Sequence, residues 1–444
     1  GNFLNNGLVD PYRNPHPHLS EVKKVYEPVQ FNYLGNGAIE IENKNFFTDL
    51  SDKSLELKLL VNGKPSVLIS NIDIKIAPQS KTKMHFNKIP DMFIPESEFI
   101  LEVSLIQKEA TDILPKGHEI AWDQFVLNKG INMESSMYEG EILAVRNLKN
   151  ENEIQIQNNL IDFKINSDTG EIISWLFKSK EITKQPIRPN FWRPPTDNDL
   201  GNNMHKWAEI WQNATYNYTA KLISKPLNVY ENVDFEVEYS TPQNDSKVFV
   251  CYQLHMSGKL EVEYTYSPIK KDLPNIPRLG MYLTLSSEFT DISWYGKGPE
   301  ESYWDRKNGQ KTGIYSGKII DQFERYPRPQ ETGNKTDVRW MKASSDNLHL
   351  KVSGKTMLNS SIWPFTMKEI DFNSGDAGES ASGLVPVTKK HGADIKIGNN
   401  IQWNIDFLQM GVGGDTSWGR LVHPEYTIPA NNTYHYSFTI EPKQ

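Results

Sequence analysis

The sequence predicts an all-β protein built from antiparallel sandwiches. Alanine, the best helix former, accounts for only 13 of 444 residues, whereas the chain has 19 Tyr, 19 Phe and 11 Trp. This balance favours strands over helices. Apolar and polar residues also alternate in many short windows separated by Gly, Pro, Asn or Asp, as half-buried strands do. We therefore expect sandwiches rather than a wound α/β sheet.

Composition excludes several classes of protein. The net charge of −8 and the pI of about 5.8 disfavour a basic nucleic-acid binder. No apolar stretch approaches the roughly 18 residues that a membrane-spanning helix needs. The single cysteine, Cys251, excludes an intrachain disulfide and any multi-cysteine metal site. The alternation around it predicts that the Cys251 thiol is buried and inert.

The first third of the chain divides by composition. Residues 1–30 contain several prolines and no alternating pattern, so they are predicted to be a tail or the remnant of another domain. Residues 31–127 hold roughly seven alternating windows, the number expected of one immunoglobulin-like sandwich. The dipeptide Asn62-Gly63 between two of these windows predicts a tight hairpin.

The remaining chain is predicted to be a linker followed by one large domain. Residues 128–140 show no alternation and form the candidate linker. Residues 141–444 alternate without another obvious break, which predicts a single β domain near the upper size limit for one core. The only fair helical pattern lies around 205–211, where Trp207 and Trp211 are four residues apart.

Three segments of the large domain are richer in polar and aromatic residues than strands require: 190–201, 294–306 and 411–418. The first carries two Asp and one Asn within three positions, which suit a cation or sugar hydroxyls, although such residues also form ordinary turns. The second mixes aromatic rings with carboxylates and arginine, as carbohydrate surfaces do, but loop packing explains it equally well. In the third, glycines precede Trp418, whose ring is suited either to a ligand platform or to a core.

These segments carry a resemblance to a known family. The motifs Arg193-Pro-Pro-Thr-Asp-Asn-Asp, Gly296-Lys-Gly-Pro-Glu-Glu-Ser-Tyr-Trp-Asp-Arg and Gly413-Gly-Asp-Thr-Ser-Trp resemble the carboxy-terminal portion of large bacterial β-galactosidases of glycoside hydrolase family 2. The resemblance implies that residues 1–30 match the end of the catalytic barrel, residues 31–127 its immunoglobulin-like domain, and residues 141–444 the terminal supersandwich with a galactose mutarotase fold.

The resemblance also implies site residues. Members hydrolyse β-galactosides by a retaining mechanism with two carboxylates on a (β/α)₈ barrel, and this sequence is too short before residue 31 to hold one. No catalytic residue is therefore expected here. Trp418 matches an aromatic platform for the sugar, and Asp199 a polar contact near the same entrance. Phe3 and Asn6 match part of a sodium site, and the complete enzyme is expected to use magnesium and sodium.

Other interpretations stay open on the sequence alone. A free-standing carbohydrate-binding or aldose-epimerase-like protein would need a His and Glu pair, yet His255 and His349 both lie in alternating windows. A structural assembly module is a third option, since family members are commonly homo-oligomers. The expected partners are β-galactosides and the missing amino-terminal and barrel domains. The sequence leaves the compartment open between bacterial cytoplasm and periplasm.

Overall fold

The computed structural model describes residues 7–87, 89, 93–130, 140–148, 151–183, 185–229, 231–372, 377–378, 387–388, 390–416 and 419–444. The fold is all-β, as predicted. The chain forms two compact units. The smaller unit comprises 17–135 with 308–314, and the larger comprises 1–16, 136–307 and 315–444.

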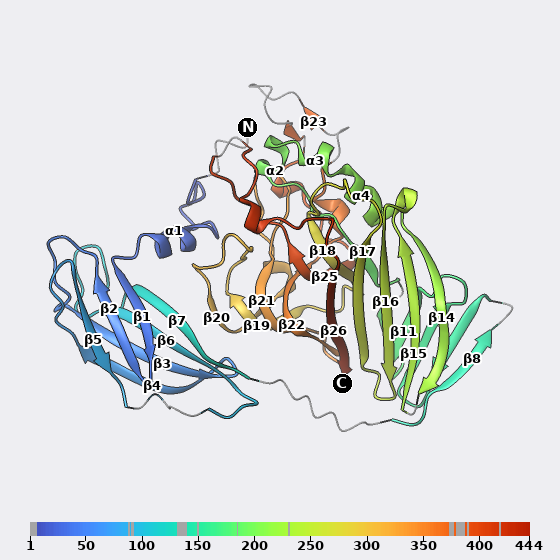
Figure 1. The fold of residues 1–444 in the computed structure, drawn as a ribbon, viewed down its shortest axis with the longest axis horizontal. Helices are drawn as coiled ribbons and strands as arrows, with labels where there is room; N and C mark the ends of the chain where they lie inside the picture. The colour runs from blue at the N-terminus through green and yellow to red at the C-terminus, as the bar shows by residue number, and fades with distance from the viewer. Residues whose placement is uncertain are drawn as a thin grey trace. The chain divides into compact units, whose positions relative to one another are not determined.

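The smaller unit is an immunoglobulin-like sandwich of two antiparallel sheets (Figure 1). One sheet has the order β1-β2-β5 and the other the order β4-β3-β6-β7. The strands are β1 (Val29–Gly35), β2 (Ala38–Asn43), β3 (Lys53–Val61), β4 (Lys64–Asp73), β5 (Ser80–His85), β6 (Glu98–Gln107) and β7 (Glu119–Lys129). The core is formed by alternate apolar residues of the two sheets, including Ile39, Ile41, Leu55, Leu57 and Val103.

The predicted hairpin is confirmed. Asn62 and Gly63 adopt φ angles of 49° and 77°, and they join β3 to β4, where Val61 pairs with Lys64. Positive φ at both central residues is the type I′ geometry that the Asn-Gly dipeptide favours. Of the predicted linker, residues 131–139 lie outside the described residues, and β7 continues to Lys129.

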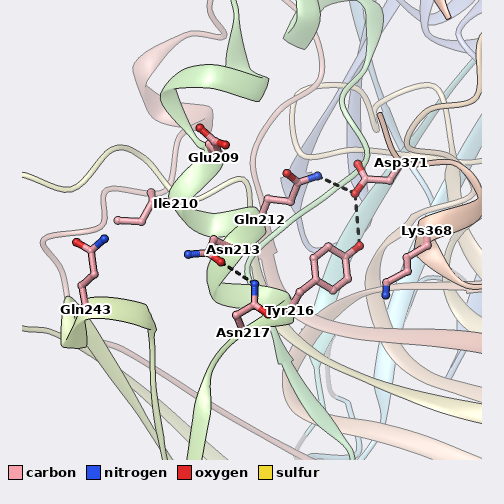
Figure 2. A pocket seen from close by; sticks show the side chains of 9 residues that line it. All are labelled: Glu209, Ile210, Gln212, Asn213, Tyr216, Asn217, Gln243, Lys368 and Asp371. Carbon is pink, nitrogen blue, oxygen red and sulfur yellow. Dashed lines mark hydrogen bonds between the residues drawn. The ribbon is translucent and has the colours of Figure 1, made fainter. Parts of the chain in front are cut away.

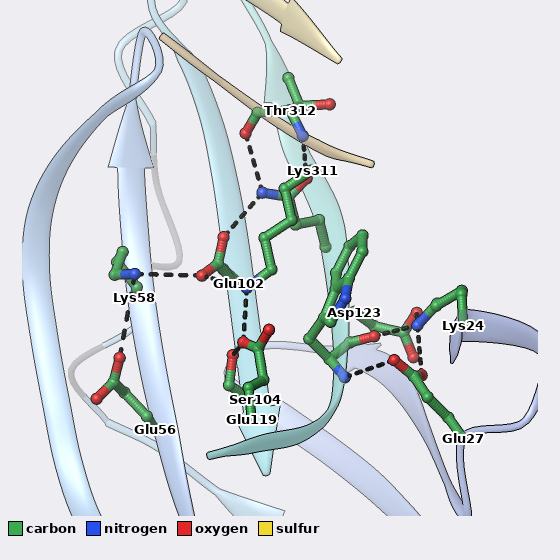
Figure 3. A network of polar contacts seen from close by, with 12 residues as sticks. Lys24, Glu27, Glu56, Lys58, Glu102, Ser104, Glu119, Asp123, Lys311 and Thr312 are labelled. Carbon is green, nitrogen blue, oxygen red and sulfur yellow. Dashed lines mark hydrogen bonds and ion pairs between the residues drawn. The ribbon is translucent and has the colours of Figure 1, made fainter. Parts of the chain in front are cut away.

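The structure also shows two features of the smaller unit that the sequence did not predict. Helix α1 (Leu19–Val25) lies within the segment expected to be an irregular tail. The segment 308–314, far away in the sequence, belongs to this unit as well. Its Lys311 ammonium lies 3.0 Å from Glu102 and 2.7 Å from Glu119, and Thr312 exchanges two hydrogen bonds with the Gln124 amide (Figure 3).

The larger unit contains three sheets in its described part. A five-stranded sheet has the order β12-β11-β10-β9-β8, and a small β23-β24 pair lies near the carboxy-terminal third of the sequence. The twelve-stranded sheet follows the path β13-β18-β25-β22-β26-β17-β16-β15-β14, with β19, β20 and β21 attached through β22. Strands β14 to β17 run side by side in Figure 1 as consecutive antiparallel neighbours.

The strands of the larger unit are β8 (Ala144–Leu148), β9 (Glu153–Gln157), β10 (Ile161–Asn166), β11 (Ile172–Phe177), β12 (Lys180–Thr183), β13 (Arg188–Asn190), β14 (Thr219–Val229), β15 (Asn232–Ser240), β16 (Ser246–His255), β17 (Leu260–Pro268), β18 (Arg278–Ser286), β19 (Asp291–Gly298), β20 (Lys311–Lys318), β21 (Lys335–Ser344), β22 (His349–Trp363), β23 (Ala377–Gly378), β24 (Val387–Thr388), β25 (Asn400–Gln409) and β26 (Tyr434–Lys443). Strand β20 starts within the segment assigned to the smaller unit.

Three short helices interrupt the strands: α2 (Asp197–Gly201), α3 (Met204–Trp207) and α4 (Glu209–Tyr216). The single helix expected around 205–211 is therefore wrong in extent, because the chain leaves the helical conformation at Ala208. Trp211 is fully buried, whereas Trp207 only packs against the rim of the core. In the described part of the chain, no helix is long and apolar enough to cross a membrane.

The predicted alternation matches the core of the larger unit. Strand β17 buries Leu260, Val262, Tyr264 and Tyr266, and its neighbours do the same with their alternate residues. The prediction that the Cys251 thiol is buried is wrong. Strand β16 buries Val248, Val250 and Tyr252, so the thiol lies on the other, half-exposed face of the strand. Burial and a contact with Glu236 raise the pKa of Cys251 to about 12, so the thiol is nonetheless inert.

Candidate functional site

The structure brings the three polar and aromatic segments together around the loop 410–416 of the larger unit. Arg193, at the start of the first motif, is fully buried and donates to the Met410 carbonyl and, at 2.8 Å, to the Gly411 carbonyl. Asn198 donates to the Val412 carbonyl at 3.4 Å. Side chains of the first motif therefore hold the third motif by hydrogen bonds to the backbone carbonyls of that motif and its flanking Met410.

Asp199 forms the counter-charge of Arg193. Its carboxylate lies 2.9 Å from Nη2 and 3.1 Å from Nε, both groups being buried. The same carboxylate accepts from the Thr196 N–H, while the Thr196 hydroxyl accepts from the Asp199 N–H, which completes a capping box at α2. These contacts account for the Asp199 carboxylate within the fold, and its contact with a sugar stays a prediction.

Asp305, in the second motif, holds the loop from its other side. Its carboxylate accepts from the Val412 N–H at 3.0 Å and from the Gly413 N–H at 2.7 Å. A Cβ atom at Gly411 would lie 2.6 Å from Asp305 Oδ2, and one at Gly413 would lie 3.0 Å from it. The glycines are thus needed so that the carboxylate can approach two consecutive backbone N–H groups.

Hydrogen bonds from Arg328 and Gln330 hold the amino-terminal turn of α2. Arg328 Nε donates to Asp197 Oδ1 at 2.8 Å, and Gln330 Nε2 donates to Asp197 Oδ2 at 3.0 Å. Arg328 also donates to the Pro195 carbonyl at 2.8 Å. Sequence reasoning did not find Arg328 or Gln330, because no motif marks them and they lie more than 130 residues from Asp197.

Glu301, in the same segment as Asp305, is a buried carboxylate. It pairs with Arg306 at 2.5 Å and accepts from the Tyr326 hydroxyl, the Thr332 hydroxyl and the Gly333 N–H. Although burial opposes ionisation, Arg306 and these donors hold the pKa of Glu301 below its ordinary value. The group therefore stays charged and organises its loop rather than donating a proton at neutral pH.

Ser417 and Trp418 lie outside the described residues, so the predicted role of Trp418 as a sugar platform is untested. The residues that flank them are described. Gly419 has a φ of 86°, and a side chain there would collide with the backbone of Gly201. Asp415 lies 2.7 Å from His423 Nε2 and raises the pKa of that imidazole. The described residues on both sides of Trp418 therefore contact other parts of the larger unit.

A fully buried ionic cluster lies next to this site in the fold. Arg278 lies 2.7 Å from Glu331 and 3.4 Å from Asp406. Backbone hydrogen bonds join the Arg278 N–H to the Phe191 carbonyl and the Glu331 N–H to the Pro194 carbonyl. Burial raises the pKa of Asp406 to about 7, against the opposing effect of Arg278. The cluster links strands β18 and β25 to the first motif.

A pocket of about 750 Å³ opens beside α4 (Figure 2). Its lining residues are mostly polar and comprise Glu209, Ile210, Gln212, Asn213, Tyr216, Asn217, Gln243, Lys368 and Asp371. Asp371 accepts a hydrogen bond from Trp192 Nε1 at 2.9 Å, and Trp192 directly precedes Arg193. The sequence analysis assigned no functional role to any residue of this pocket, although α4 overlaps the predicted helix.

The structure also contains a His–Glu pair, which an epimerase would need and which the sequence did not indicate. His255 Nε2 lies 3.0 Å from Glu261 Oε1 at the β16–β17 hairpin. Hydrogen bonds from His255 and Lys259 lower the pKa of Glu261 to about 2. A carboxylate that is so acidic is a poor general base at neutral pH, so the pair reads as structural. His349 begins β22, where Ser344 pairs with it.

The predicted metal ligands are not tested by the structure. Phe3 and Asn6 lie outside the described residues. Within the described ranges, no group of three or more His, Cys, Asp or Glu side chains is arranged to hold a metal ion.

Comparison with known families agrees with the fold and the converging motifs. The model of the family described as beta galactosidase small chain matches residues 157–440, well over half of the chain. The chain belongs to this family. A second model, beta-galactosidase domain 4, matches residues 39–128, which is the sandwich of the smaller unit. The chain corresponds to the carboxy-terminal portion of a β-galactosidase.

Curated relatives are longer than this chain. A beta-galactosidase of Priestia megaterium is 30% identical over 449 residues, covering 100% of this chain and 41% of the relative. A beta-galactosidase of Halalkalibacterium halodurans is 29% identical, and the match covers 99% of this chain and 42% of the relative. The chain thus spans about two fifths of the length of the curated relatives it matches.

Comparison with solved structures gives matches of low TM-score. A galactose mutarotase related enzyme of Lactobacillus acidophilus covers 66% of this chain at 12% identity and a TM-score of 0.37. A putative aldose 1-epimerase of Escherichia coli covers 64% at 7% identity and a TM-score of 0.33. The assignment of the chain rests on the family models rather than on these neighbours.

Proposed function

We propose that this chain is the region of a glycoside hydrolase family 2 β-galactosidase that forms a wall of the active site. The observation that carries the proposal is the convergence of three motifs on loop 410–416, in a chain that the small-chain family model matches. The full-length enzyme would remove terminal β-D-galactosyl residues from galactosides with retention of configuration.

In this proposal the chain binds and orients, and the barrel of the full-length enzyme supplies both catalytic carboxylates. Trp418 offers its ring to the apolar face of the galactosyl unit. Arg193 and Asp305 fix the loop that precedes it. A contact of the Asp199 carboxylate with the sugar is proposed from the family resemblance, beside its ion pair with Arg193. Sodium held in part by Phe3 and Asn6, and magnesium elsewhere in the full-length enzyme, are implied by the family resemblance. Assembly into a homo-oligomer is proposed on the same ground.

The test uses the full-length enzyme and this chain in parallel. Ring stacking contributes on the order of 1 kcal/mol, so Trp418→Ala should raise the KM for an aryl β-galactoside several-fold to about tenfold. The melting temperature should change little. The isolated chain should not hydrolyse the same substrate above the buffer rate. An unchanged KM together with a sharply lowered melting temperature would make Trp418 a core residue, and turnover by the purified chain would reveal a catalytic pair within it.

A further inference from the structure

We propose that the pocket beside α4 binds a neutral oligosaccharide, at a site separate from loop 410–416. The proposal does not depend on hydrolysis by the full-length enzyme. It starts from one face of the helix. Glu209, Gln212, Asn213 and Tyr216 recur at three- and four-residue spacing and line the pocket, whereas Trp211 is buried in the core (Figure 2).

Hydrogen bonds within the pocket fix the orientation of its amides. Gln212 Nε2 donates to Asp371 Oδ2 at 3.0 Å, so the side-chain carbonyl on the other side of the amide is the group that can accept from a ligand. Asn217 Nδ2 donates to Asn213 Oδ1 at 2.7 Å, which leaves the Asn213 N–H groups and the Asn217 carbonyl for a ligand. The pocket therefore presents acceptors and donors whose directions are set before a ligand arrives.

Asp371 is the group that organises this arrangement. Besides Gln212, its carboxylate accepts from Trp192 Nε1 and from the Phe372 N–H, both at 2.9 Å, and from the Tyr216 hydroxyl at 3.4 Å. Contacts from Trp192, from α4 and from the backbone N–H of the next residue hold the carboxylate in place. The hydrogen bond from the Gln212 amide to Asp371 therefore fixes the orientation of this amide.

The chemistry of the lining favours a neutral, hydroxyl-rich ligand. Sugar hydroxyls both donate and accept, and primary amides complement both roles. An anion would find a single ammonium, Lys368, opposed by Glu209 and Asp371. An apolar ligand would leave the amides unpaired, which is costly. The volume of about 750 Å³ lies within the roughly 300–1,000 Å³ of small-molecule sites, and the Tyr216 ring and Ile210 add apolar surface.

The experiment titrates the isolated chain with lactose, with a β-linked galactotetraose and with an oligogalacturonate, using saturation-transfer NMR and calorimetry. We expect the tetrasaccharide to bind with a Kd on the order of 1 mM, as open, polar sites do. The variant pair Asn213→Ala and Asn217→Ala removes exposed amides and should weaken binding at least fivefold. Gln212→Leu should do the same. Asn431→Ala, an exposed amide elsewhere on the larger unit, is the matched control and should change nothing.

Three results would overturn the proposal. One is the absence of binding by any neutral oligosaccharide at tens of millimolar. Another is binding that the Asn213 and Asn217 pair leaves unchanged while Trp418→Ala abolishes it, since the ligand would then occupy loop 410–416. The third is a clear preference for an oligogalacturonate, which would make the ligand an anion. Melting curves of every variant identify loss of folding, and the two exposed asparagines keep the test valid if Gln212→Leu does not fold.

Discussion

Single carboxylates in the larger unit perform different tasks because their surroundings differ. The Asp305 carboxylate accepts hydrogen bonds from two backbone N–H groups and shapes a loop. Asp406 is buried against one arginine, and this burial raises its pKa and favours its neutral form. The sequence identified the segment of Asp305 through its aromatic and charged neighbours. It could not identify Asp406, because its environment is built by β18 and by Glu331, each distant in the sequence.

Removing the Asp305 carboxylate should loosen loop 410–416. Asp305→Ala deletes two charge-assisted hydrogen bonds, which together contribute roughly 1–3 kcal/mol. The amide hydrogens of Val412 and Gly413 should then exchange about ten to a hundred times faster. Hydrogen exchange of the folded chain, followed in the proteolytic peptide that contains the loop, measures this change. Asp291→Ala, at an exposed ion pair, is the control. Equal exchange in both variants would mean that other contacts hold the loop.

Asp406 should make stability depend on pH. Its pKa is about 7 in the folded chain, against an ordinary value of 3.8. Between these values the folded state keeps a proton that the unfolded state releases, so the free energy of unfolding falls as pH rises, by at most about 1.4 kcal/mol per pH unit. Asp406→Asn should reduce the pH dependence of the melting temperature between about pH 4 and 7. Parallel pH curves for the native chain and this variant would contradict the assignment, and Asp346→Asn, at an exposed site, is the control.

Secondary-structure elements were predictable where the signal is local. The Asn62-Gly63 turn and the buried face of β17 follow from dipeptide chemistry and period-two alternation. The helices were not predictable. Helix α2 has only five residues and depends on a capping box, and α3 ends at Trp207, inside the predicted pattern. Short helices of this kind are stabilised by packing and capping rather than by their own propensity.

The segment 308–314 is the element whose role depends most on distant residues. Its Lys311 ammonium lies between Glu102 and Glu119 and 5.0 Å from the centre of the Trp122 ring (Figure 3). Burial raises the pKa of Glu102, but Lys311 and Lys58 outweigh this effect and keep it below its ordinary value. Gly309 also packs against the backbone of Ser20 and Glu21 too closely for a side chain.

Lys311→Met should therefore destabilise the smaller unit. The change leaves the buried Glu102 with Lys58 at 3.2 Å as its remaining cation, and it removes a partner of Glu119. Because the ammonium is partly exposed, we expect a loss of about 1–2 kcal/mol in the free energy of unfolding, measured by urea denaturation. Lys318→Met, at the exposed end of β20, should cost much less. Equal losses would show that the ion pairs around Glu102 contribute nothing specific.

At the scale of the whole chain, the all-β class and the family could be predicted, but the path of the chain between the units could not. Composition and alternation predicted a sandwich followed by a large β domain. The assignment of 1–16 to the larger unit and of 308–314 to the smaller one depends on contacts across hundreds of residues, which no local pattern encodes. The same reason explains why Arg328 and Gln330 were missed while the three motifs were found.

This chain path predicts an unusual result on cleavage between 131 and 139. A protease site inserted there divides the chain into residues 1–135 and 136–444, yet each unit is completed by a segment of the other fragment. The fragments should therefore elute together from a sizing column in native buffer and separate only in denaturant. Replacing 308–314 by a Gly/Ser segment of equal length removes Lys311, Thr312 and Gly309 from the smaller unit and should weaken this association. Fragments that separate in native buffer before any replacement would show that each unit is complete without the exchanged segments.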